Sequence, residues 1–181
     1  MNFLSHYYFD RYASDSHQVL GGLLPDLLKN IDKRYSFQLH KFEDQLEFSP
    51  HAIALTAGWK RHVEVDRIFH NTDFFYTHTH QLRKALVHVV QDLPIRASFL
   101  AHISLELLLD HLLMEQQLLS VSRLYEHLEN VDKTVLKSYL KVFGSIDEEH
   151  FFAFYDRFVS SKYIFKYAEI ENISHALFNI C

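Results

Sequence analysis

The stretch LPIRASFLAHISLELLLDHLLM, residues 93–114, is apolar around nearly its whole circumference when it is read as a helix. A helix of this kind is expected at the centre of a helical bundle. Its polar exceptions, His102, Glu106 and Asp110, follow one another at intervals of four residues, so they share one face over two turns. The stretch therefore predicts an all-α fold in which a buried helix carries a row of ionisable side chains.

The rest of the chain agrees with a helical fold. Only 4 glycines and 3 prolines occur among the 181 residues, which leaves few tight turns, and no segment alternates in the manner of a β-strand. The length suits a single domain over residues 1–181, with a core large enough to fold without a disulfide or a metal. We predict an all-α, single multi-helix bundle of about seven to nine helices.

Helix boundaries follow from periodicity and capping residues. Gly21, Gly22 and Pro25 predict a kink or break in the second helix. Ser49 followed by Pro50, then Thr72 or Asp73, and later Ser145 with Glu148, have the pattern of helix N-termini. The expected helices cover about 2–12, 17–30, 35–47, 50–70, 73–91, a helix from Pro94, and two or three more, one beginning at Ser145.

Charge and targeting features limit the classes of partner. The formal net charge of −5 argues against a nucleic-acid partner, because phosphate binding needs a basic face. The single cysteine, Cys181, allows no disulfide within one chain, which suits a reducing, cytoplasmic compartment. We expect no signal peptide and no membrane span, since no uninterrupted apolar stretch approaches about 18 residues.

A second polar row lies in RHVEVDRIFH, residues 61–70. His62, Asp66 and His70 are again four residues apart. This face could bind a metal, or it could be solvated surface, because charged residues flank it. The row in the apolar stretch favours function more strongly, since buried ionisable groups are costly unless they are paired or bound to a metal. Structural ion pairs for Glu106 and Asp110 remain the alternative.

Two more polar residues interrupt apolar segments. His6 lies in the first expected helix, and Asp26 lies among leucines in LGGLLPDLLKN. Each by itself is more often a satisfied core group than a ligand. Together with the two polar rows, and with 14 histidines in the chain, they form a His/Asp set of the kind that holds divalent ions such as Mn²⁺ or Fe²⁺.

Four segments, in order, resemble motifs of the bacterial acyl carrier protein phosphodiesterase family. MNFLSHYYF is similar to its N-F-L-A-H opening, and LGGLLPDLLKN to its G-N-x-L-x-D-F-x-[KR]-G element. GWKRHVEVD resembles G-I-x-x-H-x-x-I-D, and LELLLDHLL resembles L-D-x-x-x-D-H-x-L. The resemblance covers about the first 115 residues. The chain departs from it at Gly22, at His70 where the family has an aspartate, at Glu106 where aspartate is common, and at His102, which has no counterpart.

The resemblance implies a divergent, HD-like relative of the metal phosphohydrolases. The family hydrolyses the phosphodiester that links 4′-phosphopantetheine to a serine of acyl carrier protein, an acidic partner in fatty acid biosynthesis. Mn²⁺ is the usual cofactor, with Mg²⁺ or Fe²⁺ as alternatives. Carried over by position, the expected metal ligands are His6, Asp26, His62, Asp66 and Asp110.

The hypothesis for the other polar residues concerns proton transfer and orientation. His70, His102 or His111 would protonate the leaving serine oxygen, because imidazole titrates near neutral pH. Glu106 would orient a ligand or a water. Lys29, Lys60, Arg61 and Arg67 are candidates for contact with phosphate or with the carrier protein. Two alternatives stay open: a hydrolase of another small phosphoester on the same fold, and a helical binding protein without catalytic activity.

Overall fold

The computed structural model of the chain describes residues 1–46, 48–91 and 93–178, and Cys181 lies outside this part. Within it the chain is all-α, as predicted, with nine α-helices, three 3₁₀ segments and no strand. The elements in order are α1 (Phe3–Asp10), α2 (Ser16–Ile31), η1 (Leu39–Lys41), η2 (Glu43–Gln45), α3 (Pro50–His70), α4 (Asp73–Leu86), α5 (Ala97–Glu115), α6 (Val121–Glu129), α7 (Lys133–Lys141), α8 (Glu148–Ser161), η3 (Tyr163–Ala168) and α9 (Ile170–Phe178).

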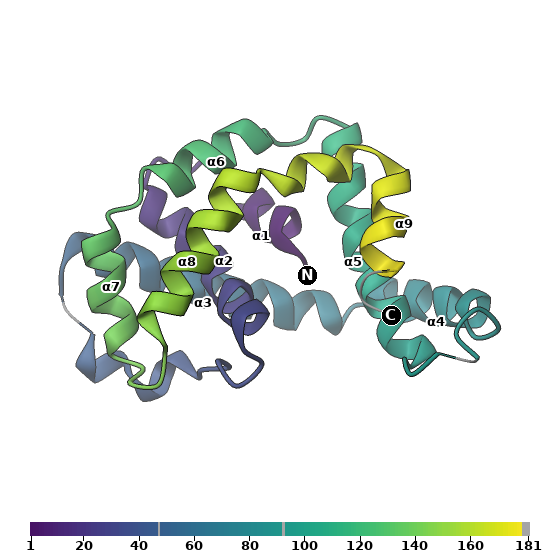
Figure 1. Cartoon of the computed structure of the whole chain (residues 1–181), viewed down its shortest axis with the longest axis horizontal. Coiled ribbons are helices and arrows are strands. Elements are labelled where there is room, and N and C mark those ends of the chain that lie inside the picture. Colours follow the sequence, from purple (N-terminus) through teal and green to yellow (C-terminus); the bar gives the residue numbers. More distant parts are fainter. Residues whose placement is uncertain (47, 92, 179–181) are drawn as a thin grey trace.

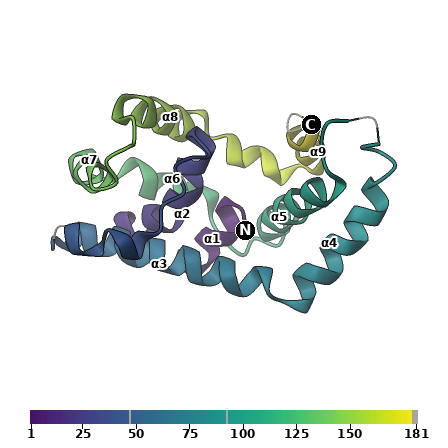
Figure 2. The same cartoon turned by 90° about the horizontal axis from the view of Figure 1, so that it is seen from below.

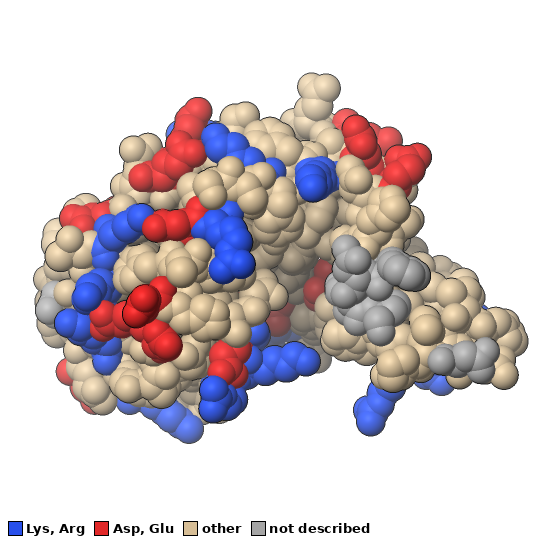
Figure 3. All heavy atoms as spheres, in the orientation of Figure 1, with Lys and Arg blue, Asp and Glu red and all other residues tan. Residues whose placement is uncertain are grey.

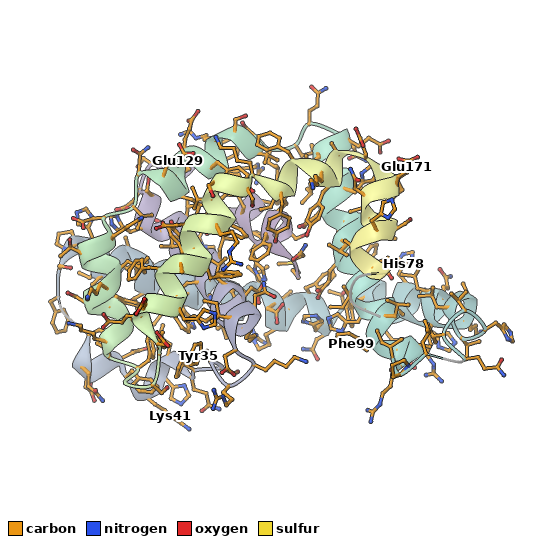
Figure 4. All side chains as sticks on the ribbon, in the orientation of Figure 1. Tyr35, Lys41, His78, Phe99, Glu129 and Glu171 are labelled. Carbon is orange, nitrogen blue, oxygen red and sulfur yellow. The ribbon has the colours of Figure 1, made fainter. Side chains whose placement is uncertain are left out.

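The helices form a main body with a projecting arm. Figures 1 and 2 show α2, α6, α7 and α8 on one side, the short α1 in the middle, and α4 with the start of α5 extending away from the body, while α3 runs from that side to the arm. One hydrophobic cluster takes side chains from α1, α2, α3, α5, α6, α7, α8, η3 and α9. None of the described residues of α4 is buried. The labelled side chains follow this division, with Tyr35 and Lys41 toward the body and His78 and Phe99 toward the arm (Figure 4).

The most buried helix is α2, not α5 as the apolar stretch predicts. Ten residues of α2 are buried, among them Leu20, Leu23 and Leu24. On α5, by contrast, Phe99 is 49% exposed and Leu112 is 41% exposed, because only part of this helix meets the core and the remainder pairs with the arm. The long apolar run therefore belongs to a helix with two partly covered faces and not to the central helix of the bundle.

Helix α5 is also long and apolar enough, by length and composition, to cross a membrane. The window has a mean hydropathy of 1.4, and 39% of it is buried inside the protein. The core helices of soluble proteins meet the same criterion. Within this window, Glu106 and Asp110 are buried against protein partners.

Two predicted helix starts are confirmed by capping hydrogen bonds. The Ser49 hydroxyl accepts a hydrogen bond from the Ala52 N–H at 3.1 Å, and the Thr72 hydroxyl accepts one from the Phe75 N–H at 3.1 Å. The predicted start at Ser145 is wrong. Asp147 caps α8 instead, through the His150 N–H. An aspartate two residues downstream offers a carboxylate to the free amides, which competes well with a serine hydroxyl.

Other helix boundaries also differ from the predictions. Of the kink or break predicted at Gly21, Gly22 and Pro25, the break does not occur, since α2 runs unbroken from Ser16 to Ile31. The helix expected from about Pro94 begins at Ala97, and the one expected to reach about Gln91 ends at Leu86. Over its described residues, the helix predicted for 35–47 is two short 3₁₀ turns, η1 and η2.

The 35–46 segment departs from a helix because its aromatic residues reach the core from a looser backbone. Phe37 stacks on Phe143 with ring centroids 4.7 Å apart, and Phe42 meets the same ring edge-on at 5.0 Å. Burial of aromatic surface of this size outweighs the few hydrogen bonds that a marginal helix would add.

Helices α2 and α3 touch backbone to backbone. A Cβ atom on Gly21 would lie 2.1 Å from the carbonyl oxygen of Leu55, and one on Gly58 would lie 2.1 Å from that of Gln18. Both obstacles are main-chain atoms, which cannot turn aside as a side chain could. The two helices can approach this closely only because neither glycine has a side chain.

We expect Gly58→Ala to lower the free energy of unfolding by about 2–3 kcal/mol, the upper part of the usual range for overpacking, or by more because the obstacle is backbone. Urea denaturation followed by circular dichroism measures this. The matched control is Ala57→Gly on the exposed side of the same turn, with an expected loss of about 1 kcal/mol from helix propensity alone. A Gly58→Ala protein as stable as the parent would contradict the close packing.

Candidate metal centre

Three side chains from three helices converge beside the α2–α3 contact. His6 lies on α1, Asp26 on α2 and His62 on α3, and one ligand atom from each lies within 4.8 Å of the other two. His6 Nε2 is 3.6 Å from Asp26 Oδ2, and His62 Nε2 is 3.7 Å from Asp26 Oδ1. Two ligands at about 2.1–2.3 Å from one ion, at angles of 90–110°, are about 3.0–3.8 Å apart. The spacing therefore fits a shared cation.

The glycine contact positions His62 within this cluster. Its Nδ1 lies 2.8 Å from the carbonyl oxygen of Gly22, which is exposed to α3 by the close approach of the two helices. Nδ1 donates to this carbonyl, so Nε2 carries the lone pair. A histidine whose outer nitrogen is held by a carbonyl is the usual arrangement at metal sites, because it sets both tautomer and ring orientation. The His6 and His62 rings stack with centroids 3.7 Å apart.

Burial keeps both imidazoles neutral and disfavours the ionised carboxylate. Burial lowers the pKa of His62 to about 4, and burial together with the neighbouring His62 holds the pKa of His6 well below its usual range. Burial raises the pKa of Asp26 to about 7, although Lys29 acts in the opposite direction. His6 Nε2 is buried and has no hydrogen-bond partner among the described residues. A divalent cation would be coordinated by the lone pair of His6 Nε2 and would favour the ionised form of the Asp26 carboxylate.

A second cluster joins α3 to α5. His70 Nε2 lies 3.2 Å from His102 Nε2 and 3.2 Å from Glu106 Oε1, and His102 Nε2 lies 2.7 Å from the same oxygen. Burial alone would raise the pKa of Glu106, but the hydrogen bond from His102 and the amino group of Met1 hold it at about 2. The two polar rows predicted from the sequence therefore do face each other in the fold.

Asp66 connects the two clusters. Its Oδ1 lies 3.9 Å from His6 Nε2, and its Oδ2 lies 3.3 Å from His70 Nδ1. The amino group of Met1 lies 2.6 Å from Asp66 Oδ1 and 3.0 Å from Glu106 Oε1. In the space-filling view, the surface is hollowed between the α2–α8 side and the α5–α9 side, and acidic side chains are visible at its floor (Figure 3).

Two predicted site residues are placed outside both clusters. Asp110 is fully buried, and its two oxygens accept hydrogen bonds from the Leu4 N–H at 3.0 Å, the Ser5 N–H at 2.7 Å and the Ser5 hydroxyl at 2.6 Å. These amides are the free donors at the start of α1, so Asp110 caps that helix from α5. His111 Nδ1 lies 2.8 Å from the Tyr167 carbonyl oxygen and ties α5 to η3.

A third group, Asp15, His17 and His51, is one that the sequence patterns do not single out. Its ligand atoms also converge, but those of Asp15 and His17 already have partners. Asp15 Oδ1 caps α2 by accepting from the His17 N–H, and His17 Nε2 accepts from the Asp132 N–H at 3.2 Å. The only signal in the sequence is the D-x-H spacing at the start of α2, which a capping aspartate explains equally well.

Comparison of the chain with protein-family models, with curated proteins and with solved structures finds no match.

We expect Asp110→Asn to destabilise the fold without removing a metal ligand. The side-chain amide nitrogen of the new asparagine would face a backbone N–H donor. One buried hydrogen bond would be lost and two donors would oppose each other, which would lower the free energy of unfolding by about 2–3 kcal/mol. Chemical denaturation measures the loss, and metal analysis of the folded variant should give the same metal content as the parent.

Ser5→Ala serves as the control, since it removes only the hydroxyl and should cost about 1 kcal/mol. An Asp110→Asn protein with the parent's stability but without bound metal would show that Asp110 is a ligand instead.

Proposed function

We propose that this chain is a metal-dependent phosphodiester hydrolase whose substrate class is the 4′-phosphopantetheine ester of acyl carrier protein. The observation that carries the reaction class is the convergence of His6, Asp26 and His62, with a buried His6 Nε2 that has no hydrogen-bond partner among the residues the structure describes. The choice of carrier protein as substrate rests on the sequence resemblance.

The donor set supports a divalent cation of borderline character. Two neutral imidazoles and a carboxylate suit Mn²⁺, Fe²⁺ or Zn²⁺, and Asp66 is near enough to join them. A divalent ion held there supplies Lewis-acid polarisation of a phosphoryl oxygen and lowers the pKa of a bound water toward neutrality. The residues that would hold it are His6, Asp26 and His62, with Asp66 as a fourth.

A pocket of about 370 Å³ opens directly onto this cluster. His62 and Asp66 line it on one side, and Lys29 and Arg67 bring positive charge to the same space. Its volume lies within the usual range for small-molecule sites. Aromatic residues Tyr35, Phe37 and Trp59 complete the lining, which gives apolar surface for the group attached to a phosphate.

Lys29 and Arg67, the two cations of the pocket, differ from the other basic candidates, Lys60 and Arg61, in their ion pairing. Lys60 pairs with Glu43 at 3.1 Å, and Arg61 pairs with Asp10 at 3.1 Å, so their charges are already compensated. In the described part of the chain no carboxylate lies within ion-pair distance of Arg67, and Lys29 reaches only Asp26, at 3.9 Å. Lys29 and Arg67 would therefore bind and orient the phosphodiester anion beside the cluster.

The central experiment measures metal and hydrolysis together. We expect the Mn²⁺-loaded chain to release phosphopantetheine from holo-acyl carrier protein, detected by mass spectrometry. His62→Ala and His6→Ala should lose the ion and at least about 100-fold in rate, since each removes a ligand. His88→Ala, an exposed histidine of the arm, is the matched control and should behave as the parent.

A panel of phosphodiesters and phosphomonoesters run in parallel separates the alternatives. Hydrolysis confined to another phosphoester would replace the carrier protein as substrate. A chain that binds the ion and hydrolyses none of these esters would be a binding protein. If the chain bound no ion after addition of Mn²⁺, the proposal of a metal-dependent hydrolase would be refuted.

The pocket cations make a separate kinetic prediction. We expect Arg67→Ala to raise KM by about tenfold or more with a smaller effect on kcat, because a charge-assisted contact of about 1.5–3 kcal/mol to the anion is lost. Steady-state kinetics measure this, with Arg83→Ala on α4 as the control. Equal kinetics for the two variants would remove Arg67 from substrate binding.

A further inference from the structure

His70, His102 and Glu106 bring three ligand atoms to a single point. The two Nε2 atoms are 3.2 Å apart, and each lies within 3.2 Å of Glu106 Oε1. Three ligands that bind one ion at about 2.0–2.2 Å, at right angles to one another, are about 3 Å apart. The helices position these three side chains. His102 and Glu106 are one turn apart on α5, and His70 is the last residue of α3.

Short contacts fix the arrangement of these atoms. His70 Nδ1 lies 2.9 Å from the Asp66 carbonyl oxygen and donates to it, which leaves Nε2 to face His102 and Glu106. His102 Nε2 lies 2.7 Å from Glu106 Oε1, and the amino group of Met1 lies 3.0 Å from the same oxygen. An ion bound by the two Nε2 atoms and Glu106 Oε1 would replace these contacts.

The two rings are held in place by their surroundings. Phe75 on α4 meets His70 at 4.6 Å between centroids and His102 at 5.0 Å, edge-on in both cases. The Asp66 carbonyl fixes the tautomer of His70, as the Gly22 carbonyl does for His62. Preorganised rings with a supporting outer contact are what a metal site requires and what a solvated polar surface lacks.

An ion could reach this point from solvent. His102 is 38% exposed and lines a hollow of about 190 Å³ between α4 and α5, together with Phe75, Thr79 and Ser98. Of the three ligands, His102 therefore lies at the edge of this hollow. Metal sites that exchange water or bind a substrate keep a position open to solvent.

We propose that His70, His102 and Glu106 form a second metal site, which takes a divalent transition-metal ion separately from the site at His6, Asp26 and His62. Two imidazoles and one carboxylate are a donor set for Zn²⁺, Fe²⁺, Co²⁺ or Mn²⁺. Asp66 stands between the sites, with one oxygen directed to each. The inference does not depend on the proposed hydrolysis, because it concerns only how many ions the chain binds.

The test counts ions on the full chain. The protein is stripped with a chelator, loaded with Co²⁺, dialysed and analysed for metal, and visible absorption reports the coordination of the bound Co²⁺. We expect two ions for the parent and one each for His102→Ala and His62→Ala. His80→Ala is the matched control, because His80 lines the same hollow as His102 without joining the cluster, and it should keep two ions.

Glu106→Gln provides a second route to the same site and should also bind one ion, with circular dichroism to show that both variants are folded. Retention of two ions by His102→Ala and Glu106→Gln would overturn the second site. So would a parent that binds a single ion lost only in His62→Ala, or a parent that binds none. A single ion that is lost in His102→Ala and kept in His62→Ala would support the second site and reject the first.

Discussion

The contact between α2 and α3 is the constraint on which the rest of the structure depends. At Gly21 and Gly58 a single added carbon would stand 2.1 Å from the opposing main chain, so the two backbones are as close as helices can come. This closeness exposes the Gly22 carbonyl to His62 at 2.8 Å and brings Asp26, four residues further along α2, beside the same imidazole. Packing and chemistry are therefore set by the same pair of helices.

The cluster at this contact is costly for a protein without a bound cation. Burial holds His6 and His62 neutral and raises the pKa of Asp26 to about 7, and it leaves the Nε2 of His6 without a partner in the described part of the chain. Buried polar groups without partners lower stability, and such groups in proteins are concentrated at functional sites. The proposed ion resolves these costs together, since it binds the lone pairs and favours the charged carboxylate.

Helix α5 shows how two carboxylates one turn apart can have different roles. Asp110 accepts three hydrogen bonds from the start of α1 and so holds the helix that carries His6. Glu106 instead faces His70 and His102, and the Met1 amino group lies 3.0 Å from its Oε1. One side of α5 therefore positions the first cluster by capping a helix, and a neighbouring part of the same side contributes Glu106 to the second cluster.

The amino-acid sequence by itself determined the helical class, the starts of α3 and α4, and the two rows of ionisable residues, because periodicity and capping are local properties of the chain. It did not determine that Pro25 stays within an unbroken helix or that residues 35–46 leave the helix, since in both places packing outweighs local preference. Nor did it separate Asp110 from Asp26, because both are carboxylates among leucines. Only the tertiary structure decided that one faces the amides of α1 and the other faces two imidazoles, and this is a matter of which distant residues the fold brings near.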